Sequence, residues 1–224
     1  MQVRLPIVRW SAWPPFQAGE SAHSAPPELK LVDPMLRRRL GPLAKTLLHV
    51  ANECAAGLPG VRLVLASQHG ELSYTLAMLR SLAASEPVSP TLFSLSVHNA
   101  PAGIFSILRG ERAPSTAIAA GEETLGHALL EAYCQLDDGE EPVLMAYGDA
   151  PLPGEYRAYA ERPAPRRAIA VLLGRGAART TMLEASDAEG APASAEPQAD
   201  AFFRHLADEQ PAAWTGAQRS WAWH

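Results

Sequence analysis

The chain has 224 residues and a mass of 24.0 kDa, with 47% hydrophobic residues, 19% charged residues and a mean hydropathy of −0.07. This composition excludes a disordered, collagen-like or disulfide-scaffold chain, and the length suits one large domain over residues 1–224. The formal net charge of −5 lacks the basic excess of a non-specific nucleic-acid binder, so we expect no nucleic-acid partner.

The first residues and the cysteines bear on the cellular compartment. Residues 1–15 contain Pro6 and no uninterrupted apolar run, which argues against a secretory signal, and no stretch of the chain reaches 18 apolar residues. Cys54 and Cys134 are the only cysteines, and both fall on apolar faces of expected helices, where we expect them buried. We therefore expect a cytoplasmic protein without a membrane span.

Hydrophobic periodicity predicts alternating strands and helices over the first two thirds of the chain. A short strand over 3–13 leads into a loop rich in Pro and Ser, and apolar residues at steps of three and four then predict one long helix over 36–56. A buried strand at 61–67 and a helix at 71–85 follow. Next come a strand-like or extended segment at 90–97 and an apolar helix at 100–110. A small-residue strand at 114–119, a helix at 122–136 and a strand at 142–149 complete this part of the chain.

The last third of the chain carries weaker patterns. We expect strands at 166–175 and 179–187, a short helix at 199–209 and an irregular tail that holds three tryptophans. The alternation of strands and helices indicates an α/β domain with a mixed or parallel sheet. Its core lies at about 36–150, and residues 151–224 supply divergent strands, a helix and the tail.

Familiar catalytic motifs are absent from the sequence. It contains no GxSxG elbow, no HExxH pair and no phosphate-binding GxxxxGK[ST] loop. Its seven histidines lack the spacing of metal ligands. We therefore expect neither a metal nor a cofactor. Ser94, Ser96 and His98 share one extended segment, which leaves an acyl transferase or hydrolase as an alternative. A nucleophile and its base normally come from different elements, which weighs against that alternative.

Three segments resemble the β-ketoacyl synthases of the thiolase fold. The stretch HNAPAGIFSILRGERAP (98–114) resembles their N-x-x-A-G-x-x-S-I motif, and STAIAAGEETLGHA (115–128) resembles their nucleophile elbow, S-T-A-C-x-S-G with a following helix. The strand VLMAYGDA (143–150) resembles the one that ends in G-G-[DE]. Ile118 stands where those enzymes have their cysteine.

The resemblance implies a single-copy, N-terminal-half thiolase-like fold, with a mixed sheet of about five strands flanked by helices. It also implies that the chain is not an enzyme. A ketosynthase needs a thiolate at the start of this helix, and the isoleucine at position 118 accepts no acyl group. The histidine motifs of the second half of a ketosynthase are missing as well.

The pattern as a whole is similar to short, ketosynthase-like chain-length factors of bacterial aryl-polyene clusters. This resemblance implies a non-catalytic subunit that forms a heterodimer with an active β-ketoacyl-ACP synthase, shapes its acyl tunnel in fatty-acid or polyketide-type biosynthesis, and meets acyl carrier protein only indirectly. Expected at the partner interface are Asn99, Gly103, Phe105, Pro114, Ser115, Thr116 and Ala117. Expected at the end of the acyl tunnel are Leu76, Leu79, Phe105 and Ile118. Ordinary core packing of Leu76 and Leu79, and a homodimeric scaffold, remain alternatives.

Overall fold

The computed structural model describes residues 1–15, 26–137, 141–160, 166–177 and 179–224, and is built around one mixed sheet. The strands are β1 (Gln2–Trp13), β2 (Arg62–Ala66), β3 (Ser115–Ile118), β4 (Val143–Asp149), β5 (Arg167–Leu173), β6 (Arg179–Asp187), β7 (Ala212–Thr215) and β8 (Arg219–Trp223). Their order is β3-β2-β4-β5-β1-β6-β8-β7. The strands β3 and β4 run parallel to β2, and all other neighbours are antiparallel. The α/β class with a mixed sheet is confirmed, whereas the expectation of about five strands is wrong, since the sheet has eight.

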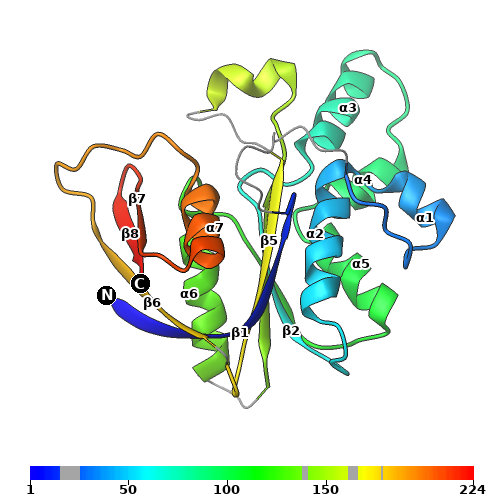
Figure 1. Ribbon diagram of the computed structural model, residues 1–224. Coiled ribbons are helices and arrows are strands. Elements are labelled where there is room, and N and C mark those ends of the chain that lie inside the picture. Colours follow the sequence, from blue (N-terminus) through cyan, green and yellow to red (C-terminus); the bar gives the residue numbers. More distant parts are fainter. Residues whose placement is uncertain (16–25, 138–140, 161–165, 178) are drawn as a thin grey trace.

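Helices cover both faces of this sheet (Figure 1). They are α1 (Pro34–Arg39), α2 (Pro42–Cys54), α3 (Leu72–Ala83), α4 (Pro90–Ser96), α5 (Ala100–Arg109), α6 (Thr124–Asp137) and α7 (Gln198–Asp208), with a 3-10 helix η1 (Gly154–Tyr159). One apolar core lies between the sheet and the α6–α7 layer, and the second lies between the sheet and the α2–α5 layer. Because β4 and β5 are buried on both faces, they are continuous apolar runs in the sequence.

The carboxyl-terminal part of the chain is as regular as the rest. The strand β5 lies between β4 and β1, and the three tryptophans Trp214, Trp221 and Trp223 are at most 1% exposed in the β7–β8 hairpin. The expectation of an irregular tail is therefore wrong. Trp221 and Trp223 alternate with small residues, as a half-buried strand requires, but each strand has only four or five residues.

The secondary structure differs from the expectation in two places, and a proline with its neighbouring residue explains each difference. The helix expected over 36–56 breaks between α1 and α2, because Pro42 disfavours a helical conformation at Gly41, which lies at φ −69° and ψ 167°. The strand expected over 90–97 is the helix α4 instead. Ser89 caps it by accepting a hydrogen bond from the Leu92 amide over 3.4 Å, and Pro90 occupies its first turn.

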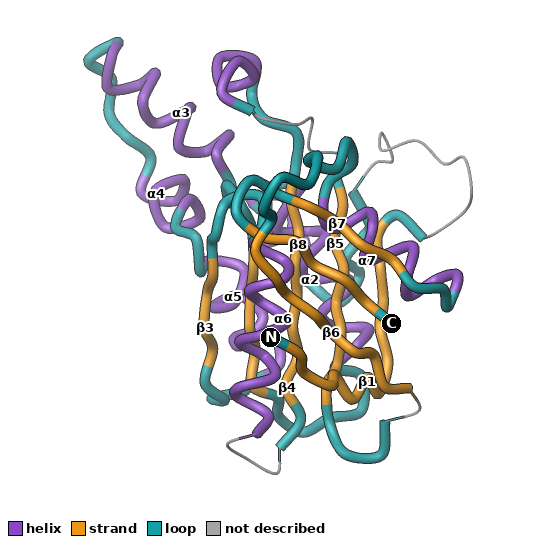
Figure 2. The backbone as a smooth tube through the Cα atoms, turned by 90° about the vertical axis from the view of Figure 1, so that its left-hand side faces the viewer, coloured by secondary structure: helices purple, strands orange, loops and turns teal. Residues whose placement is uncertain are grey.

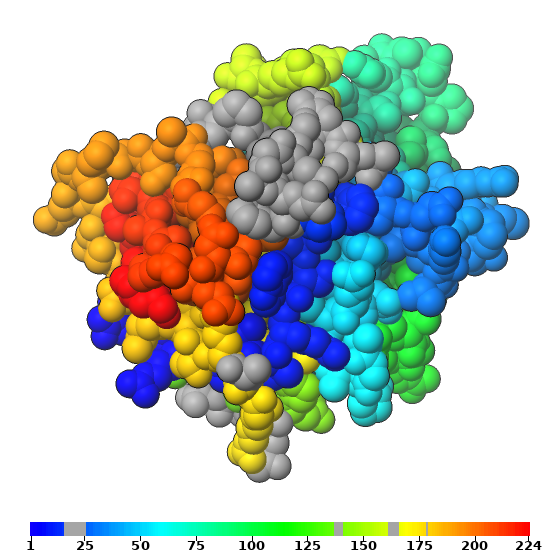
Figure 3. Space-filling model, viewed as in Figure 1, coloured from blue at the N-terminus to red at the C-terminus, as the bar shows by residue number. Residues whose placement is uncertain are grey.

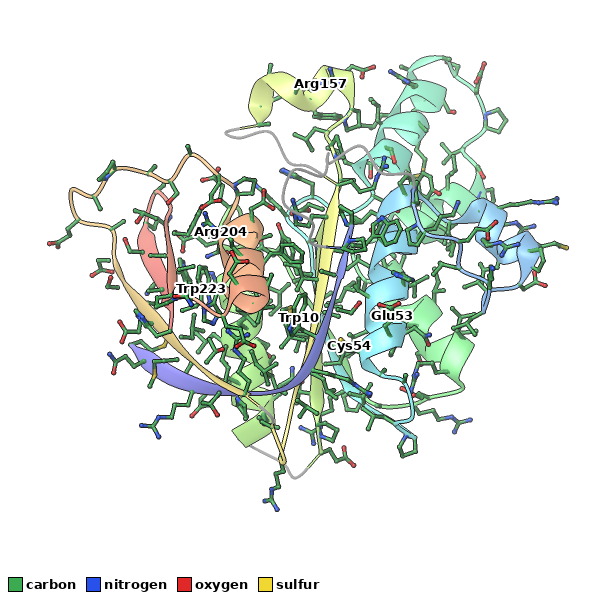
Figure 4. All side chains as sticks on the ribbon, viewed as in Figure 1. Trp10, Glu53, Cys54, Arg157, Arg204 and Trp223 are labelled. Carbon is green, nitrogen blue, oxygen red and sulfur yellow. The ribbon has the colours of Figure 1, made fainter. Side chains whose placement is uncertain are left out.

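The two cysteines differ in environment. Cys54, at the end of α2, faces the sheet (Figure 4), and its thiol donates to the Ala170 carbonyl over 3.3 Å. Burial raises the pKa of Cys54 to about 12. Cys134 is exposed, contrary to expectation, because it follows the buried Ala132 by two residues, which places it about 200° further round α6.

Candidate functional site

The helices α3 and α4 project beyond the sheet as a separate arm, which we define as residues 72–97 (Figure 2). Neither helix contains a fully buried residue. The arm nevertheless carries large apolar side chains, and the exposed fractions are 60% for Leu82 and 65% for Phe93. In the space-filling view, α3 lies at the upper right of the molecule (Figure 3). An apolar projection of this kind is typical of a protein–protein contact surface.

The expected apolar stripe of α3 is present, but it does not enter the core. Leu76 is half-buried and Leu79 is 46% exposed, so the alternative of ordinary core packing does not describe either residue in the subunit by itself. Helical periodicity identifies an apolar face but does not say whether the chain itself or another molecule covers it. The stripe is therefore surface available to a partner.

The short strand β3 forms one edge of the sheet beside this arm (Figure 2). Thr116 and Ile118 face α6. The Thr116 hydroxyl accepts from Gln135 Nε2 over 3.0 Å, and Ile118 packs against the core beneath α6. Ser115 and Ala117 are exposed on the opposite face, and Pro114, just before the strand, is exposed too.

Backbone hydrogen bonds define which groups of β3 are used within the sheet. The Leu63 amide donates to the Pro114 carbonyl over 3.1 Å, and the Ser67 amide donates to the Ile118 carbonyl over 3.2 Å. In a parallel pair of strands, every second residue directs both its amide and its carbonyl toward the neighbouring strand. Because Pro114 and Ile118 bond to β2, the amides and carbonyls of Ser115 and Ala117 point away from it. These groups form an open strand edge, which can pair with a strand of another chain.

The helix α5 presents a mixed surface. Asn99 and Gly103 are exposed, and Ile107 is 77% exposed. Phe105 is only 4% exposed, because it packs in the core between α2 and the sheet, with the Arg109 guanidinium 5.3 Å from its ring centroid. In the chain by itself Phe105 therefore offers little surface to a partner, and its expected places at the interface and at the tunnel stay predictions.

A buried polar network closes the carboxyl ends of the neighbouring strands β2 and β4. Asp149 Oδ1 accepts from the Ser67 hydroxyl over 2.8 Å and from the Gln68 amide over 3.0 Å, and its Oδ2 accepts from the Tyr147 hydroxyl over 2.5 Å. Burial raises the pKa of the Asp149 carboxyl, and these hydrogen bonds oppose the increase. Every oxygen of the carboxylate is satisfied, so the network stabilises the strand ends.

The alternative of a hydrolase or acyl transferase is not assembled. The segment is a helix, in which the Ser94 and Ser96 hydroxyls donate back to their own helix, to carbonyls three residues earlier. His98 Nε2 lies 2.8 Å from the Ser67 carbonyl oxygen and so donates to it, away from both serines. No nucleophile–base pair forms from these three residues.

Replacing Ser67 with alanine tests the importance of this network. The change leaves one Asp149 oxygen with a single donor and leaves the Gly70 amide, which donates to the Ser67 hydroxyl over 2.9 Å, without its acceptor. We expect a loss of about 1–3 kcal/mol in the free energy of unfolding, measured by urea denaturation. The exposed Ser94→Ala change is the control, and equal midpoints for the two variants would contradict the prediction.

Two further properties concern ions and membranes. Within the described ranges, no three His, Cys, Asp or Glu side chains gather where they could hold a metal ion. In the same part of the chain, no single helix has the length and hydropathy of a membrane span; α4 and α5 reach them only together, bent by 96°.

Residues 10–224 match the family model described as beta-ketoacyl synthase, N-terminal domain, and the chain belongs to this family. Its fold is therefore thiolase-like.

Several solved structures have a similar fold. A chain of the ketosynthase (ApeO) in complex with its chain length factor (ApeC) from Xenorhabdus doucetiae is similar, with 25% identity, a TM-score of 0.82 and 99% of each chain covered. The ishigamide ketosynthase/chain length factor has 15% identity and a TM-score of 0.61, with 84% of this chain and 68% of the other covered. A beta-ketoacyl synthase from Burkholderia phymatum STM815 has 16% identity and a TM-score of 0.53, with 76% and 53% covered. No curated protein matches the sequence.

Proposed function

We propose that this chain is a non-catalytic, chain-length-factor-like subunit that forms a heterodimer with an active β-ketoacyl-ACP synthase. The observation that carries this proposal is the apolar α3–α4 arm beside the open edge of β3. The likeness to a ketosynthase in complex with its chain length factor supports a ketosynthase as the partner. The biosynthesis served is of the fatty-acid or polyketide type, with an aryl polyene as product, and acyl carrier protein meets the complex through the ketosynthase.

The chemistry of the site supports a subunit without a nucleophile. Ile118 ends β3 just before α6 begins, and its side chain accepts no acyl group. Cys54 is buried at the end of α2, and Cys134 lies in the last turn of α6, so neither thiol stands at the start of that helix. We expect intact-mass analysis with acyl-carrier-protein substrates to find no acyl adduct on this chain.

The open edge of β3 offers a direct test of the heterodimer. Replacing Ala117 with proline removes an amide that points away from β2, so it leaves the bonds between β2 and β3 intact. We expect the affinity for the ketosynthase to fall about tenfold, measured by titration of the purified subunits.

The matched control is Ala117→Thr, which keeps the amide and suits a strand. Unchanged affinity of the proline variant would exclude pairing through this edge. A wild-type chain that is a stable, monodisperse monomer and does not co-purify with a ketosynthase would contradict the heterodimer itself.

The arm also supplies candidates for closing the partner's acyl tunnel. We assign this role to Leu76 and Leu79, which lie on the apolar stripe of α3, with Ile118 filling the vacant nucleophile position. Shortening Leu79 to alanine should shift the products of the reconstituted complex toward longer chains, because it enlarges the space at the tunnel end. Mass spectrometry of the products measures the shift. Leu31→Ala, exposed outside the arm, is the control, and an unchanged length distribution would remove Leu79 from this role.

A further inference from the structure

The α3–α4 arm has few apolar contacts that could fix its orientation. Among its described apolar residues, only Leu95 packs against the core beneath α2 and α5. The helix α3 has no buried residue and contacts mainly α4, which belongs to the same arm. Besides the exposed ion pair between Arg80 and Glu155 of η1, its position relative to the sheet therefore depends on polar contacts near the start of α3.

Glu71 makes the principal contact of this kind. It immediately precedes α3, where its carbonyl accepts from the Tyr74 amide over 3.0 Å, and it is only 6% exposed. Its carboxylate Oε1 also accepts from the Ala44 amide over 2.8 Å. A buried carboxylate at the beginning of α3 thus binds a backbone amide at the beginning of α2.

The N-terminus of α2 is built to receive this carboxylate. Its N-cap, Gly41, provides no side-chain hydrogen bond, and its first turn contains no acidic residue, so the Ala44 amide depends on an acceptor from elsewhere. A Cβ atom at Gly41 would overlap the Glu71 carboxylate, so glycine is required for the close approach. The positive end of the α2 dipole also favours a carboxylate there.

Tyr74 adds a second contact one turn further along α3. Its hydroxyl donates to the Arg39 carbonyl over 2.7 Å, at the end of α1. Glu71 and Tyr74 therefore join α3 to both sides of the corner between α1 and α2. We call this pair of contacts the latch.

We propose that Glu71, with Tyr74, is a positioning residue that fixes the orientation of the α3–α4 arm for contact with the partner subunit. This inference rests on the proposed function, because it assigns the arm to the interface. If the latch holds the arm in its binding-competent orientation, the apparent dissociation constant varies inversely with the latched fraction. A variant that opens the arm should therefore lose affinity by the factor by which its latched fraction falls.

The test compares hydrogen exchange and binding in the full-length chain. In Glu71→Ala, we expect the latched fraction to fall to about one tenth. Residues 72–83 should then lose most of their protection from amide exchange while β4 and β5 stay protected, and the dissociation constant for the co-purifying ketosynthase should rise about tenfold. Glu71→Gln should be closer to wild type in both measurements, because its amide oxygen still accepts from the Ala44 amide. Tyr74→Phe removes only a hydroxyl and should show a smaller, parallel change, which keeps the test usable if Glu71→Ala does not fold.

The control is Glu86→Ala, an exposed acidic residue on the same arm, which should change neither quantity. Unchanged exchange over residues 72–83 in both latch variants would overturn the latch while leaving the heterodimer intact. Loss of most of this protection without loss of affinity would overturn its role in binding, because the arm would then lie outside the interface. A wild-type chain that binds no ketosynthase would refute the proposed function separately.

Discussion

Replacing both Leu82 and Phe93 with aspartate should abolish formation of the complex with the ketosynthase. The two side chains come from α3 and α4, and they are 60% and 65% exposed in the subunit by itself. A partner that covers them would have to bury two unpaired carboxylates in the double variant, and each such burial costs several kcal/mol. We expect the affinity to fall at least about 100-fold, which corresponds to about 2.7 kcal/mol, and co-purification to be lost.

The control for this experiment is Leu31→Asp, because Leu31 is 76% exposed outside the arm. It should co-purify normally. Both variants should fold, since all three side chains are exposed and changes at such positions have little effect on stability. Co-purification of the double variant in the normal ratio would remove the arm from the interface.

Replacing Trp221 with alanine should destabilise the subunit by about 3–5 kcal/mol, a large fraction of the 5–15 kcal/mol typical of a folded domain. Trp221 is 1% exposed, and its ring packs so tightly over Gly126 of α6 that a Cβ atom at Gly126 would lie 2.6 Å from it. Its indole also donates to Glu123 Oε2 over 3.4 Å. The β7–β8 hairpin is thus fixed to the start of α6.

Urea denaturation measures this effect, and Ala222→Ser is the matched control, because Ala222 points to the opposite side of β8 and is only partly buried. The control should cost less than about 1 kcal/mol. An unchanged midpoint for Trp221→Ala would show that the hairpin contributes little to the stability of the sheet.

Much of the fold follows from local patterns in the sequence. The apolar runs at 61–67, 142–149 and 166–175 correspond to β2, β4 and β5, because strands buried on both faces leave a clear signal. The prediction of a strand-like or extended segment at 90–97 was wrong. There, the N-cap serine and the proline that follows it determined a helix, although the apolar residues also fitted an extended segment.

The candidate surface was harder to predict than the fold. The open edge of β3 lies where the resemblance led us to expect contacts with a partner, but Phe93 was missed, and Leu82 was expected only as part of the apolar stripe of its helix. Their exposure depends on α3 and α4 projecting beyond the sheet, which no local pattern encodes. Phe105 is buried for the converse reason, since α2 covers the face of α5 that carries it.

Contacts between residues far apart in the chain could not be predicted from the sequence, and the reason is geometric. Ser67 and Asp149 are 82 positions apart and meet only because β2 and β4 are adjacent and parallel. The same holds for Glu71, whose partner Ala44 lies in another helix. The sequence offered one weak signal for the latter, a glycine before Pro42 where a helix would otherwise continue.

The position of β1 has a consequence for how the chain folds during synthesis. This strand is made before the other strands of the sheet, yet its two neighbours are β5 and β6, and Trp10 pairs with Val171, 161 positions later. Until residue Leu173 has left the exit tunnel, the earliest-made strand has no complete neighbour on either side. Loop closure of this length slows folding and exposes strand edges meanwhile. The edges of β1 therefore stay unpaired until β5 and β6 have been made, and chaperone contacts during translation should concentrate on β1.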